Sequence, residues 1–375
     1  MTSKERVNKA LDHKEPDKIP IDFGGVHTSL HRKAYENLMR FYDYKNIEIN
    51  IQDVFQQVVF PCKELLDKFQ VDIIGVHSKQ SSKWKLKIDP VKDEYTDEWG
   101  TVYIRPKGGF FYDIKTPAMN SFSLEDLKRF KVPDPSDKAR FIGIKDEVLK
   151  KCKTNKAIIT FNASWGLWES LWQTRGFEQA YMDLVSNDAF LNYYLDMMLS
   201  WGSIFWRNML KEIGDLIDVV QIGDDLGTQR GPMFNPEIYN KFFKSRHKKL
   251  VEVIKNNTNA KVYIHSCGDI SWVINDFIDC GIDIINPVQV GASNMDSKKI
   301  KSEFGDKITF WGGACDPEVL LRGSKNDVKE EVKRRINDLA PNGGFIFASI
   351  HSIQANTPPE NIDAMFMTAL DLRKY

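Results

Sequence analysis

The chain has 375 residues, of which 42% are hydrophobic and 12% aromatic. Lys+Arg and Asp+Glu balance at 52 each, which argues against nucleic acid as a partner and against an acidic disordered tail. No apolar run approaches the roughly 18 residues of a membrane span, so we expect no membrane association. Five cysteines spread thinly through the chain are typical of a reducing compartment, and we expect a cytoplasmic protein.

Eight short segments rich in β-branched and aromatic residues recur along the chain, and most are nearly continuous apolar runs. Such runs are typical of parallel strands that are covered on both faces. The segments are 18–23, 72–77, 157–162, 216–223, 261–266, 281–288, 307–313 and 343–350. Helical patterns lie between and after them, at 187–213, at 236 to about 255, at 324–337 and at 359–372.

Alternation of eight strands with helices predicts a (β/α)8 TIM barrel, with residues 1–375 as a single domain. An open doubly wound sheet is the alternative, but its usual glycine-rich phosphate turn after the first strand is not evident. Residues 80–118 break the rhythm, because polar and apolar residues alternate there between glycines and prolines. We interpret this segment as an inserted β-hairpin, or two, over one end of the barrel.

The run VYIHSCGDIS places His265 and Cys267 at the end of the fifth predicted strand. Loops that follow the C-terminal ends of barrel strands converge on one mouth, where working residues are expected. Residues i and i+2 of a strand project to the same side, so His265 and Cys267 project together. Zinc binds imidazole and thiolate, so the pair predicts part of a zinc site. The alternative is a buried strand end that carries two polar residues.

Other polar residues follow the neighbouring strands. Cys315 and His351, after the last two strands, are the candidates for further metal ligands. The alternative for Cys315 is a small buried residue in the core, and the alternative for His351 is a cap on the end of the barrel. Asp225 is a candidate catalytic contact to metal or substrate, and Asp224 a candidate substrate contact, unless they cap the following turn. Arg230 can pair with an anionic substrate group or hold its loop.

A second set of candidates is aromatic. Trp165, Trp168 and Trp172 recur at i, i+3 and i+7, on one helix face. They form either a packing surface on the barrel or a stacking wall for a ring-shaped ligand, and we include Trp165 and Trp168 as candidate substrate contacts. His27, which follows Gly24 and Gly25, is a further candidate at the mouth.

Taken in order, several motifs resemble the uroporphyrinogen decarboxylase superfamily, which includes corrinoid-linked methyltransferases. They are HKEPDKIPIDFGG, GDDLGTQRGPMFNPEIY, IHSCGDI, GIDIINPVQ, FWGGACDP and GGFIFASIHSIQANTPPENI, and they span most of the chain. The resemblance implies a (β/α)8 barrel. True decarboxylases carry an arginine-rich segment after the first strand and an aspartate after the next, where this chain reads GGVHTSLHRKAY and GVHSKQ.

The methyltransferase branch is similar in its H-x-C pair, which His265 and Cys267 match. Alignment on TPPENI puts the branch's third ligand at His351 rather than at a cysteine, and Cys315 lies one strand earlier. The third ligand is therefore His351 or Cys315, with Asp225 as the fourth or an alternative. His351 is also a candidate catalytic residue.

The resemblance implies a zinc-dependent methyltransferase that moves a methyl group from a small donor, such as a methoxylated aromatic, to a corrinoid carried by a partner protein. The alternatives are uroporphyrinogen decarboxylation and a non-catalytic barrel that binds a corrinoid or another small molecule. A homodimer is compatible with the sequence.

Overall fold

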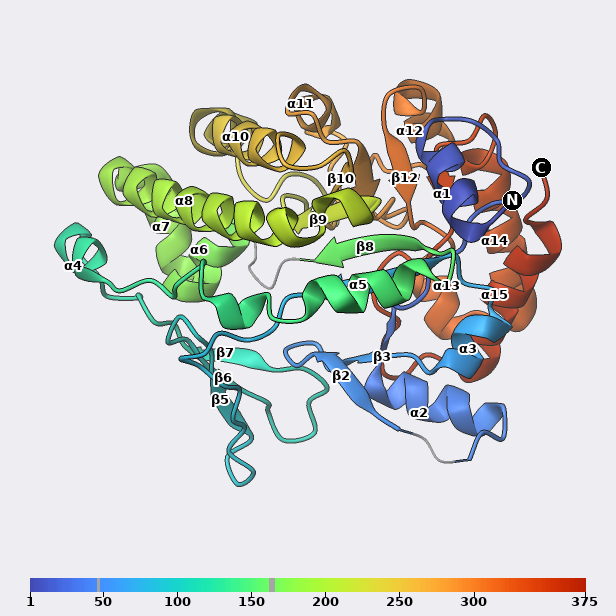
Figure 1. The fold of residues 1–375 in the computed structure, drawn as a ribbon, viewed down its shortest axis with the longest axis horizontal. Helices are drawn as coiled ribbons and strands as arrows, with labels where there is room; N and C mark the ends of the chain where they lie inside the picture. Colours follow the sequence, from blue (N-terminus) through green and yellow to red (C-terminus); the bar gives the residue numbers. More distant parts are fainter. Residues whose placement is uncertain (46–47, 162–165) are drawn as a thin grey trace.

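A curled parallel sheet forms the central layer of the computed structural model, which describes residues 1–45, 48–161 and 166–375. Within these residues the sheet has seven strands in the order β13-β12-β11-β10-β9-β8-β4. The strands are β4 (Ile73–His77), β8 (Ala157–Phe161), β9 (Val219–Gly223), β10 (Lys261–His265), β11 (Ile284–Asn286), β12 (Thr309–Trp311) and β13 (Phe345–Ile346). Helices cover the outer face of the sheet (Figure 1).

The first predicted strand closes the ring between β13 and β4. Ile21 forms a parallel bridge with Phe347, directly after β13. The backbone N–H of Asp22 donates to the carbonyl of Phe347, whose own N–H donates to Pro20. On the other side, the N–H of Asp72, which precedes β4, donates to the carbonyl of Ile21. This segment takes the eighth position, and the predicted TIM-barrel class is confirmed.

Alternate residues of the strands fill the inside of the ring, as the strand period requires. Ile159, Val219, Tyr263 and Trp311 are buried members of this inner cluster. Two residues further along a strand, the next inward-facing side chain lies at the C-terminal mouth of the barrel. His265 therefore lies on the inner side of β10, two residues beyond Tyr263.

The predicted helices are present, with one irregularity. They are α8 (Asp188–Ile213), α9 (Pro236–Ile238), α10 (Lys244–Lys255), α14 (Lys325–Leu339) and α15 (Pro359–Leu372). The predicted helix 236–255 is divided, because a π-helical turn, Tyr239–Phe243, separates α9 from α10. Its start is as expected: the Asn235 side chain accepts from the N–H of Glu237, and Pro236 takes the first helical position. None of the helices in the described part of the chain has the length and apolar character needed to cross a membrane.

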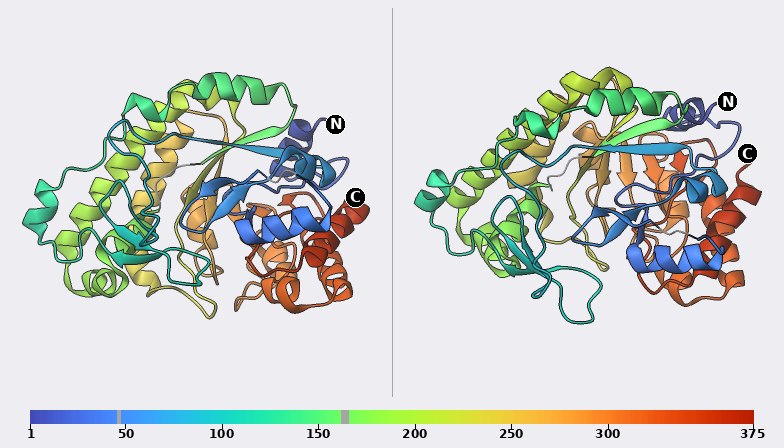
Figure 2. Two further views of the ribbon diagram at one scale, coloured as in Figure 1. Left: turned by 90° about the horizontal axis from the view of Figure 1, so that it is seen from below. Right: turned by 60° about the horizontal axis from the view of Figure 1, so that its bottom comes forward.

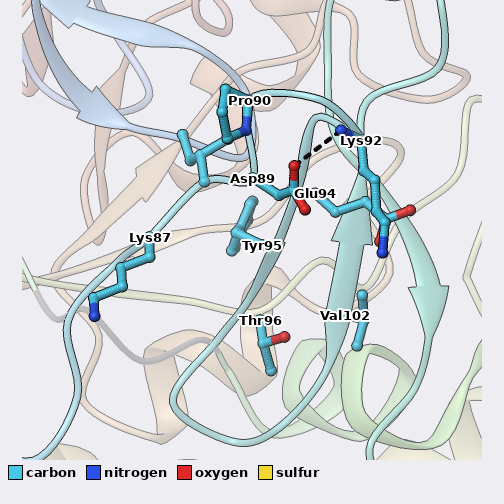
Figure 3. A pocket seen from close by; sticks show the side chains of 9 residues that line it. Lys87, Asp89, Pro90, Lys92, Glu94, Tyr95, Thr96 and Val102 are labelled. Atoms are coloured by element: carbon cyan, nitrogen blue, oxygen red, sulfur yellow. Dashed lines mark hydrogen bonds between the residues drawn. The ribbon is translucent and has the colours of Figure 1, made fainter.

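Two small antiparallel sheets lie beside the barrel (Figure 2). The inserted segment forms β5 (Glu94–Thr96), β6 (Val102–Ile104) and β7 (Asp113–Thr116), which confirms its β character. The other sheet, of β1 (Leu30–His31), β2 (Asn50–Asp53) and β3 (Val58–Phe60), was not predicted, because its strands are too short to show a period. An open pocket on the insertion is lined by charged residues, among them Lys87 and Lys92, and by one aromatic residue, Tyr95 (Figure 3).

Asp22 gives the barrel interior a pH-dependent stability. Burial raises the pKa of Asp22 to about 6, although the indole N–H of Trp311 donates to its carboxylate at 2.9 Å. The folded state therefore binds more protons than the unfolded state between about pH 4 and 6. Ionisation of Asp22 lowers the free energy of unfolding across this range, and the full loss is present above it.

We expect Asp22→Asn to raise the free energy of unfolding by about 3 kcal/mol above pH 6.5, because asparagine keeps an acceptor without the charge. At pH 4 the variant and the wild type should be nearly equal. Urea unfolding of both proteins from pH 4 to pH 8 measures the difference. A difference that does not vary with pH would contradict this account of Asp22.

Candidate metal and active site

His265 is held in a fixed tautomer at the end of β10. Its Nδ1 lies 2.6 Å from Oδ1 of Asn286, on the neighbouring strand β11. The amide nitrogen of Asn286 donates to the carbonyl of Trp311 at 2.7 Å, so the other amide atom is an oxygen that accepts. Nδ1 of His265 must therefore carry the proton, which leaves a lone pair on Nε2.

That lone pair faces the two groups that the neighbouring loops supply. Sγ of Cys267 lies 3.3 Å from Nε2 of His265, and Oδ1 of Asp225 lies 3.9 Å from it. Asp225 follows β9, and its carboxylate also accepts the backbone N–H of Cys267 at 2.7 Å. The ligand atoms of Asp225, His265 and Cys267 all lie within 4.8 Å of one another, which is compatible with a shared cation.

A close backbone contact holds the two loops together. Gly268 has φ +87°, and a Cβ at this position would lie 2.3 Å from the carbonyl carbon of Gly227. Only glycine avoids both the strain of this conformation and the clash. Gly268 therefore makes a tight turn after β10, and it sets Cys267 against the loop that carries Asp225.

Asp224 points in another direction from its neighbour. Its carboxylate is fully buried and accepts the backbone N–H groups of Trp168 and Glu169, at 3.0 Å each, in the first turn of α6 (Leu167–Arg175). Nε2 of His247, from α10, lies 3.0 Å from the second oxygen. A carboxylate at a helix N-terminus satisfies otherwise unpaired N–H groups. Asp224 thus caps α6, a helix that precedes it in the chain, and neither the substrate contact nor the cap on the following turn was predicted with this partner.

A second group brings His27, His265 and His351 together, with ligand atoms also within 4.8 Å of one another. The ring of His27 stacks on that of His265, with centroids 3.6 Å apart and planes at 9°. A metal lies close to the plane of each imidazole that binds it, so two parallel rings at this spacing cannot share one ion. The ring of His351 is inclined at 65° to that of His265, which allows a common ion.

Burial dominates the electrostatics of the site. It lowers the pKa of His265 and of His351 to about 4, and that of His27 well below its usual range. These imidazoles are therefore neutral at pH 7 and have lone pairs to offer. Burial, with the nearby charge of Asp225, raises the pKa of the Cys267 thiol well above its usual range. A bound cation reverses this preference, since it stabilises the thiolate.

Glu169 was not predicted as a site residue. Its Oε2 lies 3.7 Å from where a Cβ on Gly223, the last residue of β9, would be. Burial and the charges of Asp225 and Asp224 raise the pKa of Glu169 well above its usual range. In the run SWGLWESLW it has the pattern of an ordinary solvent-facing helix residue, so no local signal could have indicated it.

The other sequence candidates lie elsewhere. Trp168 is fully buried and packs against Phe177, Tyr181 and Phe234. These contacts agree with a packing surface on this helix face rather than a stacking wall for a ligand. Trp165 lies outside the described residues.

Arg230 is exposed on its loop, where its backbone N–H donates to Oγ1 of Thr228. Cys315 is buried, and its thiol lies 3.5 Å from the carbonyl of Asp316. It is in neither group of potential ligands found among the described residues.

Comparison with known proteins adds four findings, three from the sequence and one from the fold. The uroporphyrinogen decarboxylase (URO-D) family model matches residues 110–371. A methylcobamide:CoM methyltransferase of Methanosarcina barkeri is 27% identical over 165 residues, which span 44% of this chain and 44% of that protein. A uroporphyrinogen decarboxylase of Prochlorococcus marinus is 27% identical over 261 residues, 68% of this chain and 70% of the relative.

A methyltransferase from Methanosarcina mazei superposes with a TM-score of 0.63. The superposition covers 99% of both chains at 17% sequence identity, so it bears on the fold alone.

Proposed function

Because this chain belongs to the uroporphyrinogen decarboxylase family, we propose that it is a zinc-dependent methyltransferase that moves a methyl group from a small donor to a corrinoid protein. The observation that carries the proposal is the lone pair on Nε2 of His265, aimed at Cys267 and Asp225. The methyltransferase relative supports the reaction class, although the match spans less than half of that protein. A methoxylated aromatic is the proposed donor.

The donor set fits zinc. Two ligands bound tetrahedrally at ordinary zinc distances are separated by about 3.4–3.6 Å. The Sγ–Nε2 separation of 3.3 Å and the Nε2–Oδ1 separation of 3.9 Å lie on either side of that value. His265, Cys267 and Asp225 would hold the ion, and His351 is the fourth candidate. When bound, zinc supplies a Lewis acid that can polarise a donor oxygen or keep a thiolate deprotonated.

The residues around this set have separate roles in the proposal. Asn286 orients His265, and Asp224 positions the start of α6, which carries Glu169 toward the site. His27 covers one face of the His265 ring, and its Nδ1 is buried without a partner. An unpaired buried nitrogen is costly, so we propose that the donor supplies the missing hydrogen bond.

Methyl transfer from a methoxylated arene to cob(I)alamin, followed by the visible spectrum of the corrinoid, tests the proposal. We expect zinc-loaded protein to form methylcobalamin and chelator-treated protein to form none. Elemental analysis should find about one zinc per chain, as one His/Cys site requires. Absence of transfer across a broad panel of donors would count heavily against this function.

Uroporphyrinogen decarboxylation is the second candidate, and the longer match to the Prochlorococcus relative favours it. A substrate with many carboxylates needs several cations. Arg32, the arginine of GGVHTSLHRKAY, forms an ion pair with Glu36 within α2 (Arg32–Phe41). Carboxylate loss from the porphyrinogen by metal-free protein would favour this candidate, and binding of a corrinoid or other small molecule without turnover would favour a non-catalytic barrel.

Asn286 offers a test of the metal site that spares the ligands. We expect Asn286→Ala to weaken zinc binding by about 10–100-fold, because partners that orient a metal-bound histidine have effects of that size. Competition with a chromogenic chelator measures the affinity, and circular dichroism checks the fold. Zinc affinity equal to that of the wild type would separate Asn286 from the proposed metal site.

A further inference from the structure

The inserted segment carries a local excess of positive charge. Residues 78–92 contain five lysines and a single acidic residue, Asp89, although Lys+Arg and Asp+Glu balance over the whole chain. Lys85 and Lys87 are exposed, while Leu86 between them is half-buried against the tyrosine cluster of the insertion. Successive side chains of an extended segment point to opposite faces, so the two lysines form a row on the outer face.

A fixed turn follows this row and presents apolar side chains to solvent. The Asp89 carboxylate accepts the backbone N–H groups of Val91 and Lys92, at 2.9 and 3.1 Å. The backbone N–H of Asp89 donates to the carbonyl of Glu94 at 2.8 Å, which closes the turn. Val91 is 91% exposed, more than any other large apolar side chain in the described part of the chain, and Ile88 is also exposed. A fixed turn loses little conformational entropy when a partner covers it, so it is suited to a contact surface.

The lysines around the turn are left for other partners. None of the ion pairs formed within the described residues includes Lys85, Lys87 or Lys92. Glu94, at the start of β5, forms an ion pair with Lys115 instead. The nearby carboxylates are thus engaged, and three ammonium groups remain to meet carboxylates of another molecule.

An open pocket separates two of these lysines. It has a volume of about 510 Å³, and Figure 3 shows Lys87 and Lys92 on opposite sides of it. Ile88, Tyr95 and Val102 contribute apolar surface to its lining. The acidic residues of the lining are the two engaged carboxylates described above. Apolar surface between two cations fits an apolar side chain that is flanked by carboxylates.

The insertion is fixed to the rim of the barrel that carries the candidate site. It begins after His77, at the C-terminal end of β4. Nε2 of His31 lies 3.1 Å from the carbonyl of Phe110, in the loop between β6 and β7. The backbone N–H of His31 donates to the carbonyl of Ile353, two residues beyond His351. Figure 1 shows β5, β6 and β7 with their loops projecting from the body of the barrel. A partner that approaches the mouth therefore comes from the side on which the insertion stands.

We propose that the turn at residues 88–92 and the lysines beside it are a docking surface for a protein partner with an acidic face. The proposal rests on the proposed function, in which that partner is the corrinoid protein. Opposite charges on two surfaces speed their encounter, which suits a partner that binds and leaves in every catalytic cycle. Nucleic acid is a poorer occupant, because its phosphates gain nothing from Val91 and Ile88. Lysines that only protect a sheet edge from other strands need no apolar side chain among them.

Two labelled peptides of about twelve residues are the probes, one with glutamates around a central pair of leucines and one with glycines in place of the leucines. Fluorescence anisotropy at about 50 mM salt measures the binding of each peptide to the full chain. We expect the triple variant Lys85→Glu/Lys87→Glu/Lys92→Glu to weaken both peptides at least about tenfold. Val91→Ser should weaken the leucine peptide about threefold and leave the glycine peptide unchanged, because only the leucines lose an apolar contact.

The matched control reverses three exposed lysines of α14, in the variant Lys325→Glu/Lys329→Glu/Lys333→Glu. It has the same net charge as the first triple variant, and we expect it to bind both peptides within about twofold of the wild type. Thermal stability of all variants should match the wild type, since every changed side chain is exposed.

Equal effects of the two triple variants, equal effects of Val91→Ser on the two peptides, or failure of the wild type to bind either peptide would each overturn the docking surface. Tighter binding of a single-stranded oligonucleotide of the same length than of either peptide would overturn it in favour of nucleic acid. Methyl transfer to free cob(I)alamin by the wild type is scored separately. Transfer without lysine-dependent peptide binding removes the docking surface and keeps the function, and the reverse result removes the function and keeps the surface.

Discussion

Replacing Cys267 by serine should abolish zinc binding and methyl transfer together. The thiolate is the strongest zinc ligand in the group, and a serine hydroxyl at the same position stays protonated and binds zinc poorly. Changes to residues that merely orient a ligand already cost about 10–100-fold, so we expect loss of the ligand itself to exceed about 100-fold in zinc affinity. Zinc content after gel filtration and the rate of methylcobalamin formation are the measurements.

The matched control is Cys315→Ser. Cys315 is buried like a structural cysteine and lies in neither group of potential ligands among the described residues. We expect Cys315→Ser to retain zinc and to affect stability alone. The opposite pattern, with zinc lost in Cys315→Ser and kept in Cys267→Ser, would show that the site assembles differently from the arrangement described above.

Replacing Asp224 by alanine should cost about 3–5 kcal/mol of stability, because it leaves buried hydrogen-bonding partners without their carboxylate. The residues affected are Trp168 and Glu169, whose N–H groups it accepts, and His247. Activity should fall as well, since the start of α6 carries Glu169 to the edge of the site. Urea unfolding at pH 7 gives the stability, and the transfer assay gives the activity.

A double-mutant cycle isolates the contact with His247. If Asp224 and His247 interact directly, the loss in the double variant Asp224→Ala/His247→Ala should be smaller than the sum of the single losses by about 1 kcal/mol or more. Asp224→Asn keeps one acceptor oxygen and should lose less stability than Asp224→Ala. Strict additivity, with equal losses for both Asp224 variants, would mean that the carboxylate does not hold this junction together.

The barrel could be predicted because its strands are marked by local composition. The predicted strand at 157–162 corresponds to Ala157–Phe161, and that at 72–77 to Ile73–His77. Parallel strands buried on both faces are apolar throughout, so each is recognisable without knowledge of its neighbours. The two-residue strand period likewise predicted that His265 and Cys267 would project together, and their side chains lie 3.3 Å apart.

Only the tertiary structure decided which residues meet this pair. His27 reaches His265 from a loop near the N-terminus, and Asp224 turns toward α6 although its neighbour Asp225 faces Cys267. These choices depend on the paths of loops and on contacts between segments far apart in the chain, which no local periodicity encodes. Trp168 illustrates the same limit: the pattern defined a helix face, and packing against Phe234 and Tyr181 decided that this residue would be buried.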